Sequence, residues 1–111
     1  MKAGDITIHK ILQPDGSAKV RPVLLLKQVP PYGDWIVCAV SAQLQQEIKG
    51  FDWLLLQTDT AFAATGLKTS SLIRLGFINT ISKKVLPGPI GSIDKKTIGL
   101  LLQRLADFLI K

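Results

Sequence analysis

Short β-strands dominate the first part of the chain, where apolar residues alternate with polar ones or form brief runs. Ile6 and Ile8 alternate with polar residues, which is typical of a strand with one buried face. The apolar run at residues 20–26 predicts a strand buried on both faces. Pro22 should lie at its start, at a bulge or at an edge, because proline has no N–H to donate. Residues 35–40 are rich in β-formers and predict a third strand.

Two further strands and a helix are predicted in the rest of the chain. Residues 51–57 and 71–82 have strand character, whereas residues 58–70 form a loop of small residues. The polar residues 41–49 form either a loop or one helical turn. The terminal segment carries an apolar stripe at helical spacing, formed by Ile98, Leu101, Leu102, Leu105, Phe108 and Leu109.

The terminal helix has two candidate N-terminal caps, Ser92 and Asp94, whose side chains can accept a hydrogen bond from an early backbone N–H. Its apolar stripe faces either the core or a dimer partner. Several short strands followed by one helix predict an α+β domain whose sheet is small and curled, or closed into a barrel.

Composition narrows the class of protein. The 111 residues suit one domain, residues 1–111, and 47% hydrophobic against 20% charged residues excludes a disordered chain. No stretch reaches the roughly 20 apolar residues of a transmembrane helix. No apolar segment follows Met1-Lys2, so we expect no signal peptide and a cytoplasmic location. The mean hydropathy of +0.29 is high for a small domain, which suggests that apolar surface meets a second copy of the chain.

The positive charge is concentrated in the second part of the chain. Residues 1–66 carry six basic and six acidic residues, whereas residues 67–111 carry eight basic and two acidic ones, which gives the net charge of +6. A basic region of this kind suits a polyanion or an acidic protein segment, and the alternative is a solvated lysine-rich face.

Few residues are available for catalysis. The chain has one cysteine and one histidine, which excludes an internal disulfide, a Cys-cluster zinc site and a His-rich metal site. We therefore expect no metal and no cofactor. A Ser–His–acid triad would need His9, which lies in the first strand without a second signal and is interpreted as structural. Cys38 lies within an apolar strand and is interpreted as a buried, inert thiol.

Two of the three arginines fall within strand-like apolar segments, Arg21 directly before Pro22 and Arg74 within residues 72–75. A guanidinium is rarely buried without a partner, so each either points to solvent or lines a site for an anion such as phosphate. Ser41 lies at the end of the third strand, where a serine either forms a turn or belongs to a site.

Short motifs spread over nearly the whole chain are shared, in their order and spacing, with one protein family. They are Gly4-Asp5-Ile6, Arg21-Pro22-Val23-Leu24-Leu25-Leu26, Val37-Cys38-Ala39-Val40-Ser41-Ala42-Gln43, Thr65-Gly66-Leu67-Lys68, Ser70-Ser71-Leu72-Ile73-Arg74-Leu75 and Ile90-Gly91-Ser92-Ile93. In this order they resemble the MazF/PemK toxins of bacterial type II toxin–antitoxin systems. Each motif is short, and the specificity lies in the combination.

The resemblance implies an SH3-like barrel with a C-terminal helix, usually a homodimer. It implies a metal-independent endoribonuclease that cuts single-stranded RNA such as mRNA and is neutralised by a cognate antitoxin. The family's active-site arginine before proline, and its Thr or Ser after the third strand, correspond to Arg21 and Ser41, which we expect to be catalytic. Arg74 matches an arginine that some members use in the later strand. The residues expected to contact RNA are Arg74, Lys19, Lys68 and Gln43.

The chain also departs from the family. Gly76 stands where some members have an acid, residues 13–20 contain no histidine where some members have one, and Ala42 replaces a hydroxyl. Either Arg21 and Ser41 suffice for cleavage, or activity is weak or lost.

An Arg/Ser pair is chemically compatible with RNA cleavage, because the 2′-hydroxyl of RNA can itself attack the adjacent phosphorus. Arg21 would stabilise the negative charge of the transition state, and Ser41 would hold a phosphate oxygen or the 2′-hydroxyl. No general base follows from the sequence, since an arginine side chain holds its proton tightly. The alternatives are a non-catalytic SH3-like module that binds an antitoxin peptide or RNA, and a plain structural subunit.

Overall fold

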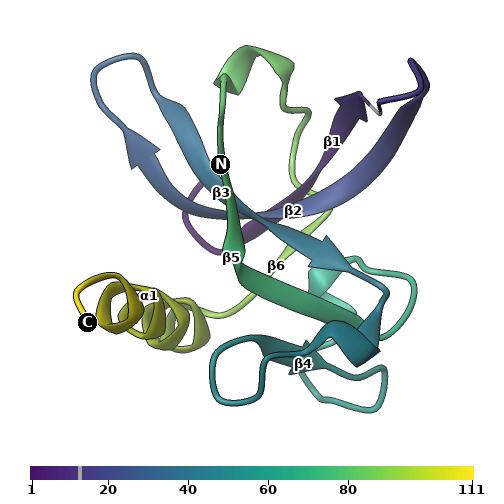
Figure 1. Ribbon diagram of the computed structural model, residues 1–111, viewed down its shortest axis with the longest axis vertical. Coiled ribbons are helices and arrows are strands. Elements are labelled where there is room, and N and C mark those ends of the chain that lie inside the picture. The colour runs from purple at the N-terminus through teal and green to yellow at the C-terminus, as the bar shows by residue number, and fades with distance from the viewer. Residues whose placement is uncertain (13) are drawn as a thin grey trace.

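A curled antiparallel sheet and one C-terminal helix make up the fold (Figure 1). The structure is a computed structural model that describes residues 1–12 and 14–111. Within these residues the strands follow the order β4-β5-β3-β2-β1-β6. The elements are β1 (Asp5–Leu12), β2 (Ala18–Val29), β3 (Asp34–Ser41), β4 (Trp53–Leu55), β5 (Ser71–Ile81), β6 (Gly91–Ser92) and α1 (Lys95–Leu109), with short 3₁₀ turns at η1 (Leu44–Gln46), η2 (Ala63–Thr65) and η3 (Lys83–Val85).

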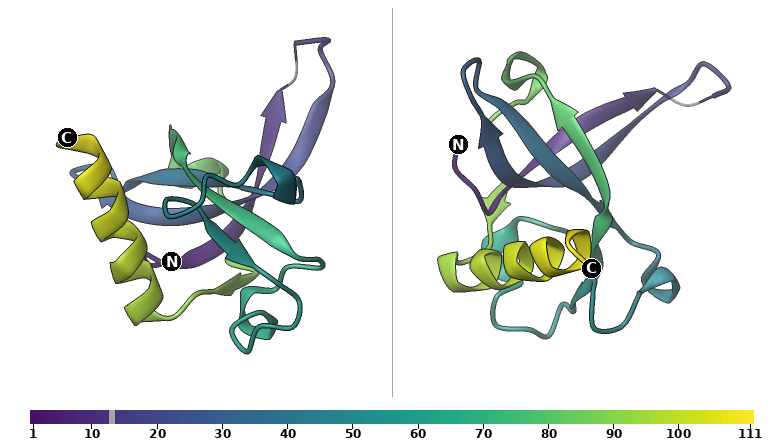
Figure 2. Two further views of the ribbon diagram at one scale, coloured as in Figure 1. Left: turned by 60° about the horizontal axis from the view of Figure 1, so that its bottom comes forward. Right: turned by 60° about the vertical axis from the view of Figure 1, so that its left-hand side comes forward.

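The sheet curls because its long strands change partner or bend along their length. The first part of β2 pairs with β1 as far as Leu24, and the later part pairs with β3 from Val23 onward. A β-bulge interrupts the β2–β3 ladder between Leu25 and Lys27, and such bulges bend a strand and increase its twist. Figure 2 shows the resulting half-barrel, with α1 lying on one side of it. The predicted α+β fold with a small curled sheet and a C-terminal helix is confirmed.

Two apolar cores lie on opposite faces of this sheet. Because side chains alternate along a strand, Leu24 and Leu26 face α1, whereas Val23 and Leu25 face the other way. The larger core includes Cys38 and the helix residues Ile98, Leu101 and Leu105. The smaller core contains Val23, Leu25, Trp35, Val37, Ile81 and Leu86. The prediction that residues 20–26 are buried on both faces is therefore confirmed for residues 23–26, and it is wrong for residues 20–22, where Val20 is 60% exposed.

The ends of several elements differ from the sequence expectations. β4 is shorter than the predicted 51–57, because the N–H groups of Phe51 and Asp52 both donate to the carbonyl of Ile48 and close a turn there. Residues 41–49 contain the 3₁₀ turn η1, which matches the alternative of one helical turn. The short strand β6 was not predicted, and it pairs with the start of β1.

The helix begins after Asp94, one of the two predicted caps. Asp94 occupies the N-cap position with the extended backbone of a capping residue, although its side chain makes no close capping hydrogen bond. The nearby Thr97 side chain and backbone N–H still favour the charged carboxylate and lower the pKa of Asp94. The end of the apolar stripe, Phe108 and Leu109, remains largely exposed, although the Phe108 ring contacts Phe51.

A buried carboxylate, Asp52, ties the loop before β4 to β5. Its Oδ2 accepts from the backbone N–H of Ile48 at 3.0 Å, and its Oδ1 accepts from the N–H of Leu75 at 3.2 Å. Arg104 of α1 donates to the carbonyls of Phe51 and Asp52, so helix, loop and strand are joined at one point.

The thiol of Cys38 is buried, as predicted. Burial, together with the negative charge of Asp52, raises the pKa of Cys38 to about 12. The thiolate is the reactive form of cysteine, so this group is chemically inert at neutral pH. Among the helices of the described residues, none has the length and apolar character needed to cross a membrane.

Candidate functional site

The strand register places the three singled-out side chains on one face of the sheet, opposite α1. Val23 of β2 pairs with Ala39 of β3, and Ala39 pairs with Arg74 of β5. Directly paired residues of antiparallel strands project to the same side, and so do residues two apart on one strand. Arg21 and Ser41 are two residues from Val23 and Ala39, so both belong to the face that carries Arg74.

Arg21 and Ser41 line one pocket of about 410 Å³, which we call the Arg21 pocket. The pairing of β2 with β3 begins at Val23 and Ala39, so Arg21 and Ser41 lie just beyond the paired region, where the two strands are free to separate. Lys68, from the loop before β5, adds a second positive charge to the lining. Among the residues that the structure describes, none of those lining the pocket is acidic; they are Ile8, Val20, Arg21, Pro22, Val40, Ser41, Ala42, Gly66, Leu67, Lys68, Thr69, Ser71 and Ile90.

The Ser41 hydroxyl is oriented by the turn that follows β3. Its Oγ accepts a hydrogen bond of 3.0 Å from the backbone N–H of Gln43. Because the oxygen accepts this bond, the hydroxyl proton can be donated to a ligand in the pocket. The Gln43 side chain is engaged elsewhere, since its Oε1 accepts from Gln45 Nε2 at 2.8 Å.

Arg74 shares the face but is not part of the pocket lining. Its Nη1 donates to Gln46 Oε1 at 3.0 Å, and its guanidinium carbon lies 3.6 Å from the centre of the Phe77 ring. Its Nε is buried and has no hydrogen-bond partner among the described residues. The expected convergence is therefore found for Arg21 and Ser41, together with Lys68, whereas Arg74 lies beside them.

Of the other expected RNA contacts, Lys19 and Gln43 do not line the Arg21 pocket. Lys19 is an exposed residue of β2, paired with Ile11 of β1 in the projecting hairpin. Gln43 reaches the site only through the backbone hydrogen bond that it gives to Ser41.

The register also places His9 next to the site. His9 of β1 is directly opposite Arg21 of β2. Side chains that face each other in this way have Cβ atoms about 5 Å apart. His9 is half-buried and lines a neighbouring hollow with Lys10, Ala18 and Val85. No spacing in the sequence indicates this pairing, which depends on the strand register alone.

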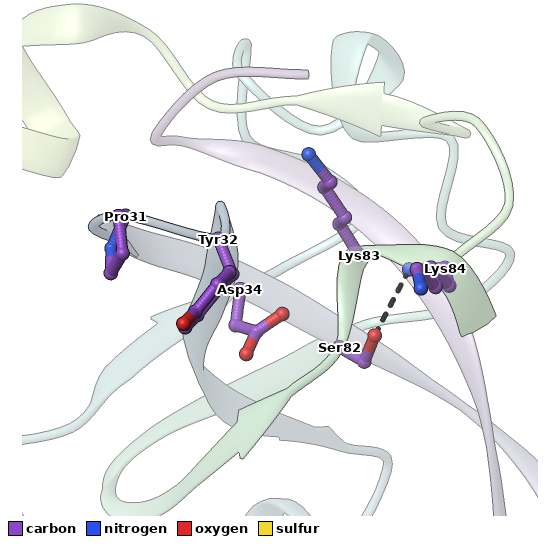
Figure 3. Close-up of a pocket in the computed structure, with 6 residues that line it drawn as sticks. All are labelled: Pro31, Tyr32, Asp34, Ser82, Lys83 and Lys84. Atoms are coloured by element: carbon purple, nitrogen blue, oxygen red, sulfur yellow. Dashed lines mark hydrogen bonds between the residues drawn. The ribbon is translucent and has the colours of Figure 1, made fainter.

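A second hollow, of about 520 Å³, lies at the other end of β3 (Figure 3). Asp34 begins β3 and Ser41 ends it, so the two sites are roughly 23 Å apart at about 3.3 Å per residue. The hollow lies between the loop carrying Tyr32 and the segment carrying Lys83 and Lys84. The charged residues of this hollow are Lys83, Lys84 and the acidic Asp34, whereas the charged residues of the Arg21 pocket, Arg21 and Lys68, are both basic.

The described residues contain no group of three or more His, Cys, Asp or Glu side chains that could hold a metal ion. The Arg21 pocket instead offers a guanidinium, an ammonium and a hydroxyl. These are donors for an anion, and a guanidinium suits phosphate in particular because it can form two parallel hydrogen bonds.

Comparison with known protein families assigns the chain to one family. Curated protein sequences give no match to the chain. The family described as "PemK-like, MazF-like toxin of type II toxin-antitoxin system" matches residues 2–109, nearly the full length. The chain thus belongs to the PemK-like, MazF-like family of toxins of type II toxin–antitoxin systems.

Proposed function

We propose that this toxin is an endoribonuclease that cleaves single-stranded RNA such as mRNA in the cytoplasm, and that residues 1–111 act as one domain. The observation that carries the proposal is the Arg21 pocket, where Arg21, Ser41 and Lys68 line one site without an acidic residue. A pocket of this charge favours a phosphodiester, and the family supplies the toxin context.

The proposed reaction uses the substrate's own 2′-hydroxyl as nucleophile, without a metal or cofactor. The bond from O2′ to phosphorus forms and the bond from phosphorus to O5′ breaks, which leaves a 2′,3′-cyclic phosphate and a 5′-hydroxyl. Arg21 stabilises the negative charge that develops on the non-bridging oxygens. Ser41 donates its hydroxyl proton to a phosphate oxygen and aligns the reacting groups.

The proton released by the 2′-hydroxyl must finally reach O5′. Histidine is the side chain that exchanges protons most readily near neutral pH. His9 is the histidine of this chain, and its position opposite Arg21 makes it the candidate for this transfer. Lys19 and Arg21 are the charged β2 residues on the same face, and both favour binding of the phosphate beside it.

The proposed assembly is a homodimer held by apolar surface. Four apolar residues of the C-terminal segment are exposed, and the last of them, Ile110, is 82% exposed; the four are Leu100, Phe108, Leu109 and Ile110. A dimer that covers them should bury on the order of 1,000 Å² or more. Light scattering at micromolar concentration should give twice the chain mass, and a monomer mass would contradict this assembly.

The proposed antitoxin contact is an acidic, partly disordered segment laid over the Arg21 pocket. Charge complementarity steers such an encounter, so binding should weaken as the salt concentration rises. The antitoxin segment and RNA should compete, and simultaneous binding of both would show that they use different surfaces.

The deciding experiment is single-turnover cleavage of a long RNA by Arg21→Ala, with and without EDTA. Loss of one transition-state donor typically costs about 10²–10³ in rate, and Arg21→Lys should rescue poorly because it lacks the fork of donors. Lys96→Ala is the matched control, since it removes one positive charge from the exposed start of α1. Circular dichroism confirms folding.

One observation favours the alternative of a non-catalytic module that binds an antitoxin peptide or RNA. Arg74 is engaged with Gln46 and Phe77 instead of lining the pocket, which leaves the pocket with one guanidinium for transition-state charge. Full cleavage by folded Arg21→Ala would remove the catalytic assignment, and an absence of cleavage by the wild type would leave the binding module as the better hypothesis.

A further inference from the structure

Phe77 is a large aromatic residue of β5 that is left exposed next to Arg74. Its side chain is 55% exposed, and it lies on β5, the second strand of the sheet order. It contacts Arg74, which belongs to the same sheet face as Arg21 and Ser41. Its exposure therefore concerns the surface where RNA is proposed to bind.

A β-bulge in β5 brings Phe77 and Arg74 together. In a regular strand, residues three apart point to opposite faces and lie about 10 Å apart. Here Ala39 pairs with Arg74 and its neighbour Cys38 pairs with Ile78, so residues 75–77 have no partner on β3. These extra residues reverse the alternation, which explains how the Arg74 guanidinium can stack 3.6 Å from the ring centre of Phe77.

The Arg74 side chain is fixed from a second direction. Its Nη1 donates to Gln46 of the turn η1 at 3.0 Å, so the guanidinium is held between that turn and the ring. The guanidinium covers one face of the ring, and the large exposed fraction of Phe77 belongs to the rest. The result is an aromatic surface whose support is already ordered before a ligand arrives.

Such a surface suits a nucleobase. Every base has a π-face that stacks on aromatic side chains, whatever the sequence, and single-strand binding proteins combine such stacking with a basic groove. The surroundings of Phe77 supply the basic part, since Arg74 lies against the ring and Arg21 and Lys68 line the neighbouring pocket. An acidic protein segment would pair with the arginines only, and an apolar segment would cover the Phe77 ring only. A nucleic acid uses both, because its phosphates contact the arginines and its bases stack on the ring.

The strand register relates Arg74 to the pocket residue Ser41. Ser41 pairs with Leu72, and Arg74 lies about 7 Å from Leu72 along β5, two residues further on. We propose that Phe77, supported by Arg74 and Gln46, is a stacking platform for an unpaired base of single-stranded RNA next to the phosphate bound in the Arg21 pocket. This inference rests on the proposed function, because it takes RNA as the ligand of that pocket.

The test measures binding without cleavage. The probe is a fully 2′-O-methylated RNA oligonucleotide, which cannot supply the nucleophile, with the fluorescent base 2-aminopurine placed at successive positions. Stacking energies of about 1–3 kcal/mol per base correspond to a Kd that rises about 5- to 150-fold in Phe77→Leu. Phe77→Trp should retain the affinity within about threefold, since an indole also stacks.

Tyr32→Leu is the matched control. Tyr32 is 77% exposed and aromatic, but it lines the hollow at the other end of β3. Its replacement should leave the Kd unchanged. In the wild type, 2-aminopurine should be quenched at one position of the oligonucleotide, and Phe77→Leu should abolish that quenching. With cleavable RNA, Phe77→Leu should raise KM and change kcat little.

The outcomes separate this inference from the proposed function. An unchanged RNA affinity in folded Phe77→Leu would overturn the stacking platform. If that variant also lost the dimer, the Phe77 ring would belong to the interface between two copies of the chain. If the wild type binds RNA through Phe77 but cleaves none, the platform stands and the nuclease proposal fails. If it cleaves RNA with no dependence on Phe77, only the platform fails.

Discussion

Removing the carboxylate of Asp52 should destabilise the fold at the point where the site-bearing strand is anchored. The side chain is 4% exposed, and its two oxygens accept from the backbone N–H groups of Ile48 and Leu75. Leaving a buried donor without a partner costs about 1–3 kcal/mol. The Leu75 N–H is fully buried, whereas the Ile48 N–H lies nearer to the surface and can be partly satisfied by water.

The magnitude follows from these two donors. Asp52→Ala should lower the free energy of unfolding by about 2–4 kcal/mol, with Leu75 contributing the larger part. Asp52→Asn has the same shape, but only one end of its amide can accept, so the loss should be about 1–3 kcal/mol. A small domain has about 5–15 kcal/mol in total, so either change is easily measured.

Urea unfolding followed by tryptophan fluorescence is the assay, since Trp53 directly follows the substituted residue. Asp59→Asn is the matched control, because Asp59 also accepts a backbone N–H, that of Leu56 at 2.7 Å, but on the exposed surface. Its replacement should cost less than about 1 kcal/mol. The reasoning fails if Asp52→Ala unfolds within about 0.5 kcal/mol of the wild type, or if both aspartates cost the same.

Three further predictions concern single side chains. The pKa of the Cys38 thiol is about 12 in the folded protein and near 9.0 in the unfolded chain. Between these pH values the free energy of unfolding should therefore fall as the pH rises, by up to about 1.4 kcal/mol per pH unit more than in Cys38→Ala. Urea unfolding at each pH measures this difference, and equal slopes in the two proteins would contradict it. His9→Gln should slow cleavage about 10²-fold, whereas an unchanged rate would exclude His9 from proton transfer. In single-turnover cleavage, Ser41→Ala should cost less than Arg21→Ala because a neutral hydroxyl is a weaker donor, and Arg74→Ala should mainly raise KM; a larger loss for Ser41→Ala would reverse these roles.

The strands and the helix could be predicted because their patterns arise from burial. The run Val23–Leu26 is buried on both faces, and an unbroken apolar run is what such burial requires. The strand β6 could not be predicted, because two residues carry no periodicity. Its Gly91 lies so close to the segment around Thr65 that an added Cβ would come within 2.2 Å of a backbone carbon there. That approach is a tertiary constraint with no local pattern.

The site was predictable only in part for a similar reason. Arg21 and Ser41 could be paired because each lies in a motif of the family, and the structure brings them to one pocket. The position of His9 opposite Arg21 depends on the register of β1 against β2, which the alternation of residues does not determine. Periodicity shows which face a side chain occupies, but neighbours across a ladder are known only when the register is known.

The β5 bulge explains why Arg74 does not line the pocket with the other two residues. Its unpaired residues include Gly76, where some members of the family carry an acid. Space does not require a glycine there, since an added Cβ would meet only Phe51 Cε2, at an ordinary contact distance of 3.5 Å. The bulge is instead fixed by the Leu75 N–H bound to Asp52, and it directs Arg74 toward Phe77. An arginine held in this way is suited to binding substrate, so the proposed catalysis rests on Arg21, Ser41 and His9.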